Sequence, residues 1–313
     1  MIASDDSPEQ GLVTAHNMLR LNALLDSAPI DTSPHRLFGT VDDDYWLWLH
    51  KEGCRKSAVL RNILPGMPDD KWQFQTVGVV GDAALQMGLN SSRAFKQIYE
   101  GLAGDFSECS SVLDFGCGWG RVIRFFLKDI DPSKLFGIDV VKQNIKFCQE
   151  SFKWGHFFQN NPFPPTWFSD EKFQLIYALS VFSHLSEDAH LKWLEEFSRI
   201  LKPGGVFIAT TWGREFITRC EKSRDQKELT PVTVHLPRLF KNTEHWLRVY
   251  DSGGFCFDTS PEAYPYFSDW MGEVCIPKGY VLNQWTKYFR FVDYIDAGPK
   301  RDVFGQNIIV ARK

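Results

Sequence analysis

The ten residues VLDFGCGWGR at positions 112–121 decide the fold. They begin as a short β-rich run, include the acid Asp114, and pass into three glycines at alternate positions. A helical-looking run at 122–128 follows at once. A strand, a tight glycine-rich turn and the start of a helix together let backbone lie against a bound small molecule. This stretch therefore predicts a strand–turn–helix unit with a ligand at its turn.

A second acid lies where such a ligand would need one. The next predicted strand, at 134–139, ends on Asp139, close to the offset of roughly 20 residues past the glycines at which an acid reaches a ribose in βαβ units. The dinucleotide fingerprint is G-x-G-x-x-G, whereas Gly116, Gly118 and Gly120 give G-x-G-x-G. The glycine spacing therefore counts against a nicotinamide-dependent oxidoreductase.

Three later stretches complete a family resemblance. The sequence resembles the class I S-adenosylmethionine (SAM)-dependent methyltransferases, in the branch whose first motif reads LDFGCGxGR. The later stretches fit that family in order and spacing: FQLIYA at 173–178, SVFSHL at 180–185 and LKPGG at 201–205. The resemblance covers residues 111–211.

The order of the predicted elements indicates an α/β fold. Alternating strands and helices imply a mostly parallel sheet with helices on both faces. The resemblance implies the doubly wound, seven-stranded, Rossmann-like methyltransferase sheet. Strands are predicted at 111–115, 134–139, 156–159, 174–179 and 205–210, with helices at 121–128, 142–153 and 187–201. Two closing strands are predicted at 287–295 and 306–311, joined by a turn at 298–299.

The chain is predicted to divide at about residue 105. Residues 1–105 form a helical N-terminal extension, which either covers the sheet or acts as a lid over the substrate. Residues 106–313 form the SAM-binding methyltransferase domain, with an aromatic-rich insertion near 251–285. Five aromatic residues of this insertion either line an acceptor pocket or pack together: Phe255, Tyr264, Tyr266, Phe267 and Trp270.

The resemblance also implies where the cofactor binds. Asp114 would hold the amino group of SAM, directly or through water, and Asp139 would accept hydrogen bonds from both ribose hydroxyls. Either Asn160 or Asn161 would contact the adenine edge, and Val140 would pack on the adenine face. The full set of implied cofactor-binding residues is Asp114, Gly116, Cys117, Gly118, Gly120, Asp139, Val140, Asn160, Asn161 and Ser180. The alternative for the two acids is ordinary turn chemistry at strand ends.

Two further residues follow the fourth strand, at the edge where open α/β sheets bind ligands. The resemblance implies that Ser180 offers backbone to the amino-acid end of SAM. His184 is the best-placed candidate for a general base or a substrate contact, and its alternative role is to orient the loop or cap the next helix. Two positions depart from the family pattern. Gln174 replaces an acid in the FDxV strand, and Trp212-Gly213 replaces a frequent His-Gly pair, which indicates a different acceptor environment.

Composition argues against several other classes of protein. The formal net charge of −4 argues against a nucleic-acid-binding surface. Seven cysteines without a C-x-x-C pair indicate free thiols in a reducing compartment. No apolar run reaches the roughly 20 residues that span a bilayer, and the N-terminus lacks a signal pattern. We therefore expect a cytoplasmic protein with no membrane or nucleic-acid partner, and no residue spacing indicates a metal site.

The sequence thus predicts a SAM-dependent methyltransferase that acts at oxygen on a small-molecule or saccharide-type acceptor. The choice of acceptor rests on the resemblance alone. Two alternatives stay open. One is a SAM-binding partner or sensor protein without catalysis, and the other, less favoured, is an NAD-dependent oxidoreductase.

Overall fold

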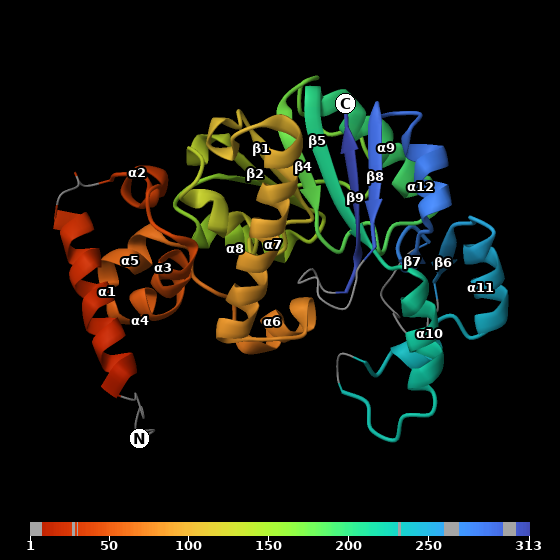
Figure 1. The fold of residues 1–313 in the computed structure, drawn as a ribbon, viewed down its shortest axis with the longest axis horizontal. Coiled ribbons are helices and arrows are strands. Elements are labelled where there is room, and N and C mark those ends of the chain that lie inside the picture. The colour runs from red at the N-terminus through yellow and green to blue at the C-terminus, as the bar shows by residue number, and fades with distance from the viewer. Residues whose placement is uncertain (1–7, 27–28, 30, 231–232, 260–268, 297–304) are drawn as a thin grey trace.

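A seven-stranded sheet forms the centre of the computed structural model, which describes residues 8–26, 29, 31–230, 233–259, 269–296 and 305–313 (Figure 1). The strand order is β3-β2-β1-β4-β5-β9-β8. The strands are β1 (Val112–Phe115), β2 (Leu135–Asp139), β3 (His156–Gln159), β4 (Phe173–Ala178), β5 (Leu201–Thr211), β8 (Phe291–Ile295) and β9 (Asn307–Arg312). The first five pair in parallel, and β9 is antiparallel to both β5 and β8. The predicted doubly wound, mostly parallel α/β sheet is confirmed.

Helices cover both faces of this sheet because successive strand residues point to opposite sides. In β4, Leu175 and Tyr177 join a core under α7 (Gly81–Ala103), whereas Ile176 and Ala178 join a core under α9 (Glu187–Ile200) and α12 (Lys278–Trp285). Near the β2–β3 edge lies α8 (Lys142–Ser151). The predicted cap of α9 is also observed, since Ser186 Oγ accepts a hydrogen bond from the backbone N–H of Ala189.

Three predicted boundaries were wrong. The strand predicted at 287–295 begins only at Phe291, because residues 286–288 form a turn after α12. The run predicted as a helix at 121–128 is a short 3₁₀ segment, η3 (Ile123–Leu127), in which Phe125 N donates to Val122 O three residues back. Its residues are buried on every side, so they lack the one-sided apolar stripe of a surface α-helix. The strand predicted at 205–210 begins earlier, at Leu201, because its first residues already pair with β4 across a register shift.

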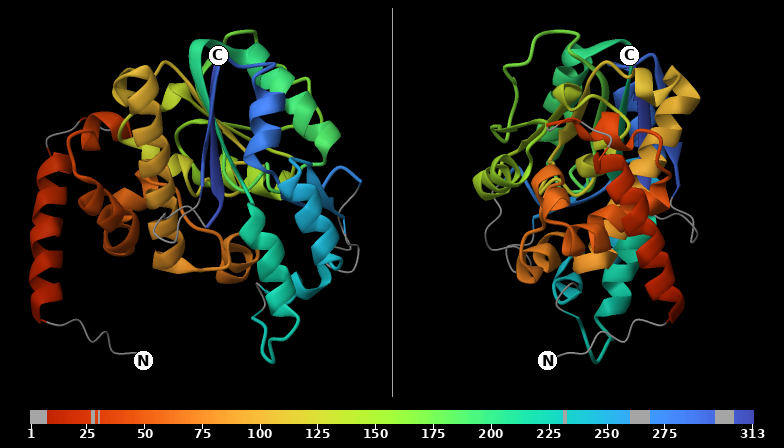
Figure 2. Two further views of the ribbon diagram at one scale, coloured as in Figure 1. Left: turned by 45° about the vertical axis from the view of Figure 1, so that its right-hand side comes forward. Right: turned by 90° about the vertical axis from the view of Figure 1, so that its left-hand side faces the viewer.

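Before α7, the N-terminal extension consists of one helix of 19 residues, α1, followed by several short ones. They are α1 (Pro8–Asp26), α2 (Pro34–Phe38), α3 (Asp43–Trp48), the π-helical turn η1 (Leu49–Gly53), α4 (Cys54–Lys56), α5 (Ala58–Ile63) and α6 (Asp70–Val77). Figure 2 shows α1 at the outer edge of the molecule, away from the sheet. The short 3₁₀ turns η2 (Phe106–Glu108) and η4 (Pro132–Lys134) precede β1 and β2.

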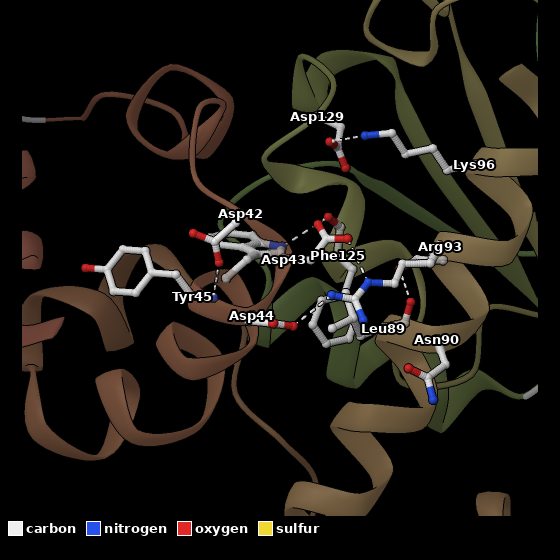
Figure 3. A network of polar contacts seen from close by, with 12 residues as sticks. Asp42, Asp43, Asp44, Tyr45, Leu89, Asn90, Arg93, Lys96, Phe125 and Asp129 are labelled. Carbon is white, nitrogen blue, oxygen red and sulfur yellow. Dashed lines mark hydrogen bonds and ion pairs between the residues drawn. The ribbon is translucent and has the colours of Figure 1, made fainter. Parts of the chain in front are cut away.

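Charged side chains fasten this extension to the core (Figure 3). Arg93, on α7, donates to Asp43 at 2.7 Å and to Asp44 at 3.0 Å, both at the start of α3. On the same helix, Lys96 donates to Asp129 at 2.8 Å. Lys128 is buried and lies 3.1 Å from Asp43. Because these pairs share partners, they form a network rather than isolated surface ion pairs.

The C-terminal third adds a small unit, and the sequence analysis did not predict the two-stranded sheet within it. It contains α10 (Arg214–Ser223), η5 (Leu236–Arg238), α11 (Thr243–Asp251) and a two-stranded antiparallel sheet of β6 (Cys256–Asp258) and β7 (Glu273–Cys275). Tyr264, Tyr266, Phe267 and the turn predicted at 298–299 lie outside the described residues. All seven cysteines are free thiols. Among the described helices, none is long and apolar enough to cross a membrane.

Candidate functional site

One cavity of about 950 Å³ opens at the carboxyl ends of the parallel strands. Nine of the residues implicated by the sequence line it: Asp114, Gly116, Cys117, Gly118, Asp139, Val140, Asn160, Ser180 and His184. Gly120 and Asn161 do not. This volume is near the upper end of the roughly 300–1,000 Å³ that small-molecule sites occupy, which leaves room for two ligands side by side.

The three motif glycines are required for different reasons. All have positive φ, at +73°, +55° and +75° for Gly116, Gly118 and Gly120. A Cβ atom on Gly120 would lie 2.3 Å from the Phe152 ring, and one on Gly116 would lie 2.4 Å from a Val181 methyl group. A Cβ atom on Gly118 would meet nothing within 4 Å. Two of the glycines therefore allow close packing of the protein itself, and only Gly118 borders open space.

The carboxylate of Asp139 is held at the wall of the cavity by three donors. Oδ1 accepts from Val141 N at 2.7 Å, and Oδ2 accepts from Gly118 N at 2.9 Å and from Asn144 Nδ2 at 3.2 Å. Burial raises the pKa of Asp139, and these hydrogen bonds lower it in part. A carboxylate has about four acceptor sites, so Asp139 keeps capacity for a further donor.

Asp114 lies deeper, 3% exposed. Its pKa is raised to about 7, mainly by burial and also by the nearby charge of Asp139, against the lowering effects of Tyr177 and Arg121. A carboxyl group in this range changes charge near neutral pH. A cationic ligand group beside it would favour the ionised form.

The structure distinguishes the two asparagines that the sequence left open. Asn160 is buried and lines the cavity, whereas Asn161 is exposed. The Nδ2 of Asn160 donates to Asn161 O at 2.7 Å, but its buried Oδ1 finds no hydrogen-bond partner among the described residues. A buried acceptor without a donor costs stability unless a ligand supplies one. The geometry therefore favours Asn160 as the ligand-facing amide.

Ser180 has a strained backbone, with φ of +57°. Its N–H donates to Thr210 Oγ1 at 2.7 Å and its Oγ donates to Gln306 Oε1 at 3.0 Å. Of the Ser180 backbone that the resemblance implies as a ligand contact, the N–H is thus already engaged within the protein. Gln306 also accepts from Thr210 at 2.6 Å. No sequence signal indicated Gln306, because it reaches the cavity from just before β9, more than a hundred residues away along the chain.

His184 lines the cavity and is held by residues at the start of β7. Its Nδ1 is 3.0 Å from Gly272 O and 3.5 Å from Oε1 of the buried Glu273. Because a carbonyl oxygen only accepts, Nδ1 carries the hydrogen, and the lone pair of a neutral imidazole lies on Nε2. The other oxygen of Glu273 accepts from Trp212 Nε1 at 2.9 Å. Sequence reasoning missed Glu273 because it lies on β7, which was not predicted.

The remaining walls come from both ends of the chain. The end of α6, at 74–78, lines the cavity, and Trp119 Nε1 donates to Thr76 Oγ1 at 3.2 Å. Trp212, Phe216 and Trp270 line the opposite end. Within the aromatic-rich insertion, Phe255 instead packs against His190 and Tyr280. Of the two alternatives for this cluster, Phe255 packs against its neighbours, whereas Trp270 lines the cavity.

Comparison with known proteins identifies the family. Residues 112–205 match the family model described as a methyltransferase domain. Over these residues the chain carries a methyltransferase domain, in agreement with the resemblance to the class I SAM-dependent methyltransferases. This family implies SAM as the cofactor. The identification agrees with the sheet order described above, in which a closing antiparallel strand, β9, is inserted beside β5.

Three curated relatives are similar over part of the chain. A tRNA (carboxymethyluridine(34)-5-O)-methyltransferase of Arabidopsis thaliana is 27% identical, over 49% of this chain and 36% of its own. A fatty-acid O-methyltransferase of Mycolicibacterium smegmatis is 28% identical, over 50% and 58%. A tRNA N(3)-methylcytidine methyltransferase of Schizosaccharomyces pombe is 33% identical, over 42% and 47%. The match thus spans from about a third to three-fifths of each relative.

The residues present fit SAM at three points. The open face of Gly118 gives a ligand access to backbone, and the Asp139 carboxylate suits a pair of ribose hydroxyls. The unpartnered Oδ1 of Asn160 suits the exocyclic amino group of adenine, which donates. These assignments are proposals, and a substitution at each residue would test its assignment independently of the others.

The raised pKa of Asp114 predicts how SAM affinity depends on pH. A cationic amino group next to Asp114 would lower the pKa of that carboxyl from about 7, so binding would release a proton. We expect affinity to rise by roughly tenfold between pH 6 and 7.5. An α-amino group itself loses its proton at about pH 7.7–8.0, so we expect SAM affinity to stop rising above that range. Calorimetry across this range measures the effect. In Asp114→Asn the dependence should vanish, and an unchanged slope in that variant would exclude Asp114.

Proposed function

We propose that this chain transfers a methyl group from SAM to an oxygen of a small-molecule or saccharide-type acceptor. One observation carries the proposal. One cavity is lined by the candidate cofactor residues, by His184, and by aromatic and charged residues of the C-terminal unit. The formal net charge of −4 supports a small acceptor over a nucleic acid.

The residues of the chain have two tasks in this reaction. When bound, SAM supplies a methyl group on a sulfonium, which is a strong leaving group. The first task of the protein is then to align the acceptor, and such positioning can account for about 7–11 kcal/mol of the barrier. The second task arises for a hydroxyl acceptor, which must lose a proton as it attacks.

His184 is suited to take that proton. Its Nδ1–H is fixed on Gly272 O, so Nε2 carries the lone pair. As the new oxygen–carbon bond forms, the acceptor proton would move to Nε2. The buried carboxylate of Glu273, 3.5 Å from Nδ1, would stabilise the resulting imidazolium. This geometry favours catalysis over a role in capping the following helix, because Ser186 provides that cap.

An acceptor screen tests the proposal. The purified chain would be incubated with SAM and panels of hydroxylated small molecules, saccharides, fatty acids and tRNA, with release of S-adenosylhomocysteine as the readout. We expect turnover with a small-molecule or saccharide panel, and at least a 100-fold loss of turnover rate in His184→Gln with a hydroxyl acceptor. Turnover with tRNA alone would refute the proposed acceptor class. SAM binding by calorimetry, without turnover on any panel, would instead support a sensor or partner protein.

A further inference from the structure

Arg219 brings a positive charge to the part of the cavity that the C-terminal unit lines, where the acceptor is proposed to bind. It belongs to α10 and lines the cavity. Its guanidinium carbon lies 5.0 Å from the centre of the Trp212 ring and 4.8 Å from that of Phe216. The two rings are stacked, with centres 4.4 Å apart and an angle of 14°. The guanidinium therefore rests on an aromatic platform within the site.

This platform is fixed on both sides. Trp212 donates through Nε1 to the buried Glu273, and Phe216 is buried in the core of the C-terminal unit. A guanidinium on a fixed surface loses less conformational entropy when it binds a ligand. Arg219 is thus better preorganised than an arginine that extends freely into solvent.

The donors of Arg219 are available, unlike those of its neighbours. Arg214, on the same helix, donates twice to Asp251, at 2.7 and 2.9 Å. Arg224, which follows the helix, donates to Thr243, Leu239 and Phe240. Within the part of the chain that the structure describes, no acid or carbonyl accepts a hydrogen bond from Arg219. Arg219 therefore lines the cavity with a planar fork of five N–H donors that no described residue engages in a hydrogen bond, and the side chain is exposed to solvent.

The cavity lining around Arg219 includes His235, apolar side chains and one buried carboxylate, Glu273. His235 lines the same end of the cavity, and its pKa is lowered by burial and then by the charges of Arg219 and His184. All three groups therefore lie close together. The nearby lining is apolar, with Leu236, Trp270 and Met271. Glu273 is engaged by Trp212 Nε1 at 2.9 Å and lies 3.5 Å from His184 Nδ1, so an anionic group on the acceptor would give Arg219 a direct hydrogen-bonding partner of opposite charge, whereas a neutral sugar would not.

We propose that the methyl acceptor carries an oxyanion, a carboxylate or a phosphate, which Arg219 binds through paired N–H donors. The apolar body of the acceptor lies against Trp270 and Met271. The inference rests on the proposed function, because it assigns a substrate class to the same site. It narrows the small-molecule acceptor to an amphiphilic acid.

Binding of matched probes tests this without turnover. The probes are 4-hydroxybenzoate against 4-hydroxybenzamide, octanoate against octanamide, and octyl phosphate against octanol, each titrated in the presence of S-adenosylhomocysteine. We expect at least one anion to bind about 10- to 100-fold more tightly than its neutral partner. Comparing the affinities of the carboxylate probes with that of octyl phosphate shows which oxyanion binds more tightly.

Variants of α10 complete the test. Arg219→Met should abolish the preference for the anion, whereas Lys222→Met, an exposed cation of the same helix outside the cavity, should leave it unchanged. The proposal is overturned if no anion binds better than its neutral partner, or if the preference survives in Arg219→Met. A chain that prefers anions in this way but methylates nothing would refute the proposed function while leaving the anion site in place.

Discussion

Asp139→Ala is expected to weaken SAM binding by about 100-fold or more. Each hydrogen bond to a charged acceptor is worth about 1.5–3 kcal/mol, and a ribose would make two of them here. The substitution also removes the acceptor for Gly118 N, at 2.9 Å, in the turn that borders the open space. Affinity should therefore fall both from lost contacts and from a loosened turn. Calorimetric titration with SAM measures the change.

Asp131→Ala provides a matched control. Asp131 also accepts a backbone N–H two residues later, from Ser133 at 3.0 Å, as Asp139 does from Val141. It does not line the cavity. Loss of this turn bond should leave SAM affinity within about twofold. If Asp139→Ala bound SAM as tightly as Asp131→Ala, the ribose would have to lie elsewhere.

Arg124→Met is expected to lower the free energy of unfolding by about 3–5 kcal/mol. Arg124 is 1% exposed and donates to three backbone carbonyls: Gly120 at 3.2 Å, Pro65 at 3.3 Å and Gly66 at 2.8 Å. Its guanidinium also lies 4.9 Å from the centre of the Trp119 ring. A methionine fills similar space but leaves these carbonyls without that donor. Urea unfolding followed by tryptophan fluorescence measures the loss.

Arg61→Met is the control for Arg124→Met, because it shows how much stability is lost when an exposed arginine is replaced in the same way. Arg61 likewise donates to two backbone carbonyls, of Cys54 and Arg55, but it is exposed to solvent. Water can replace its hydrogen bonds, so we expect a change within about 0.5 kcal/mol. Equal destabilisation by the two substitutions would mean that the buried contacts of Arg124 add nothing. The packing of the glycine turn against the loop at Pro65 and Gly66 would then not depend on the Arg124 side chain.

Much of the fold could be predicted from local sequence. Strands such as β2 and β3 have short apolar runs bounded by polar residues, and the predicted and observed bounds differ by a residue at most. The helix after Ser186 also follows from its cap and its apolar stripe. The short 3₁₀ run at 123–127 could not be distinguished from an α-helix, because a buried run has no periodic polar face.

The same reasoning from local sequence predicted only some residues of the candidate site. Asp114 and Asp139 lie in the carboxyl-terminal halves of β1 and β2, and His184 follows β4, so parallel pairing brings them to one edge of the sheet. Glu273 and Arg219 follow no motif. They reach the cavity because β7 and α10 fold back across the carboxyl end of the sheet, and Trp212 links the two through its ring.

The sequence by itself determined the parallel sheet, its glycine turn and the family, because these depend on residues that are neighbours in the chain or one strand apart. The tertiary structure alone decided which glycine borders open space, which asparagine faces the cavity, and which charges lie beside His184. Those properties depend on what packs against a residue. Phe152 and Val181 occupy the space beside Gly120 and Gly116, and nothing in the local pattern of the motif specifies that they do.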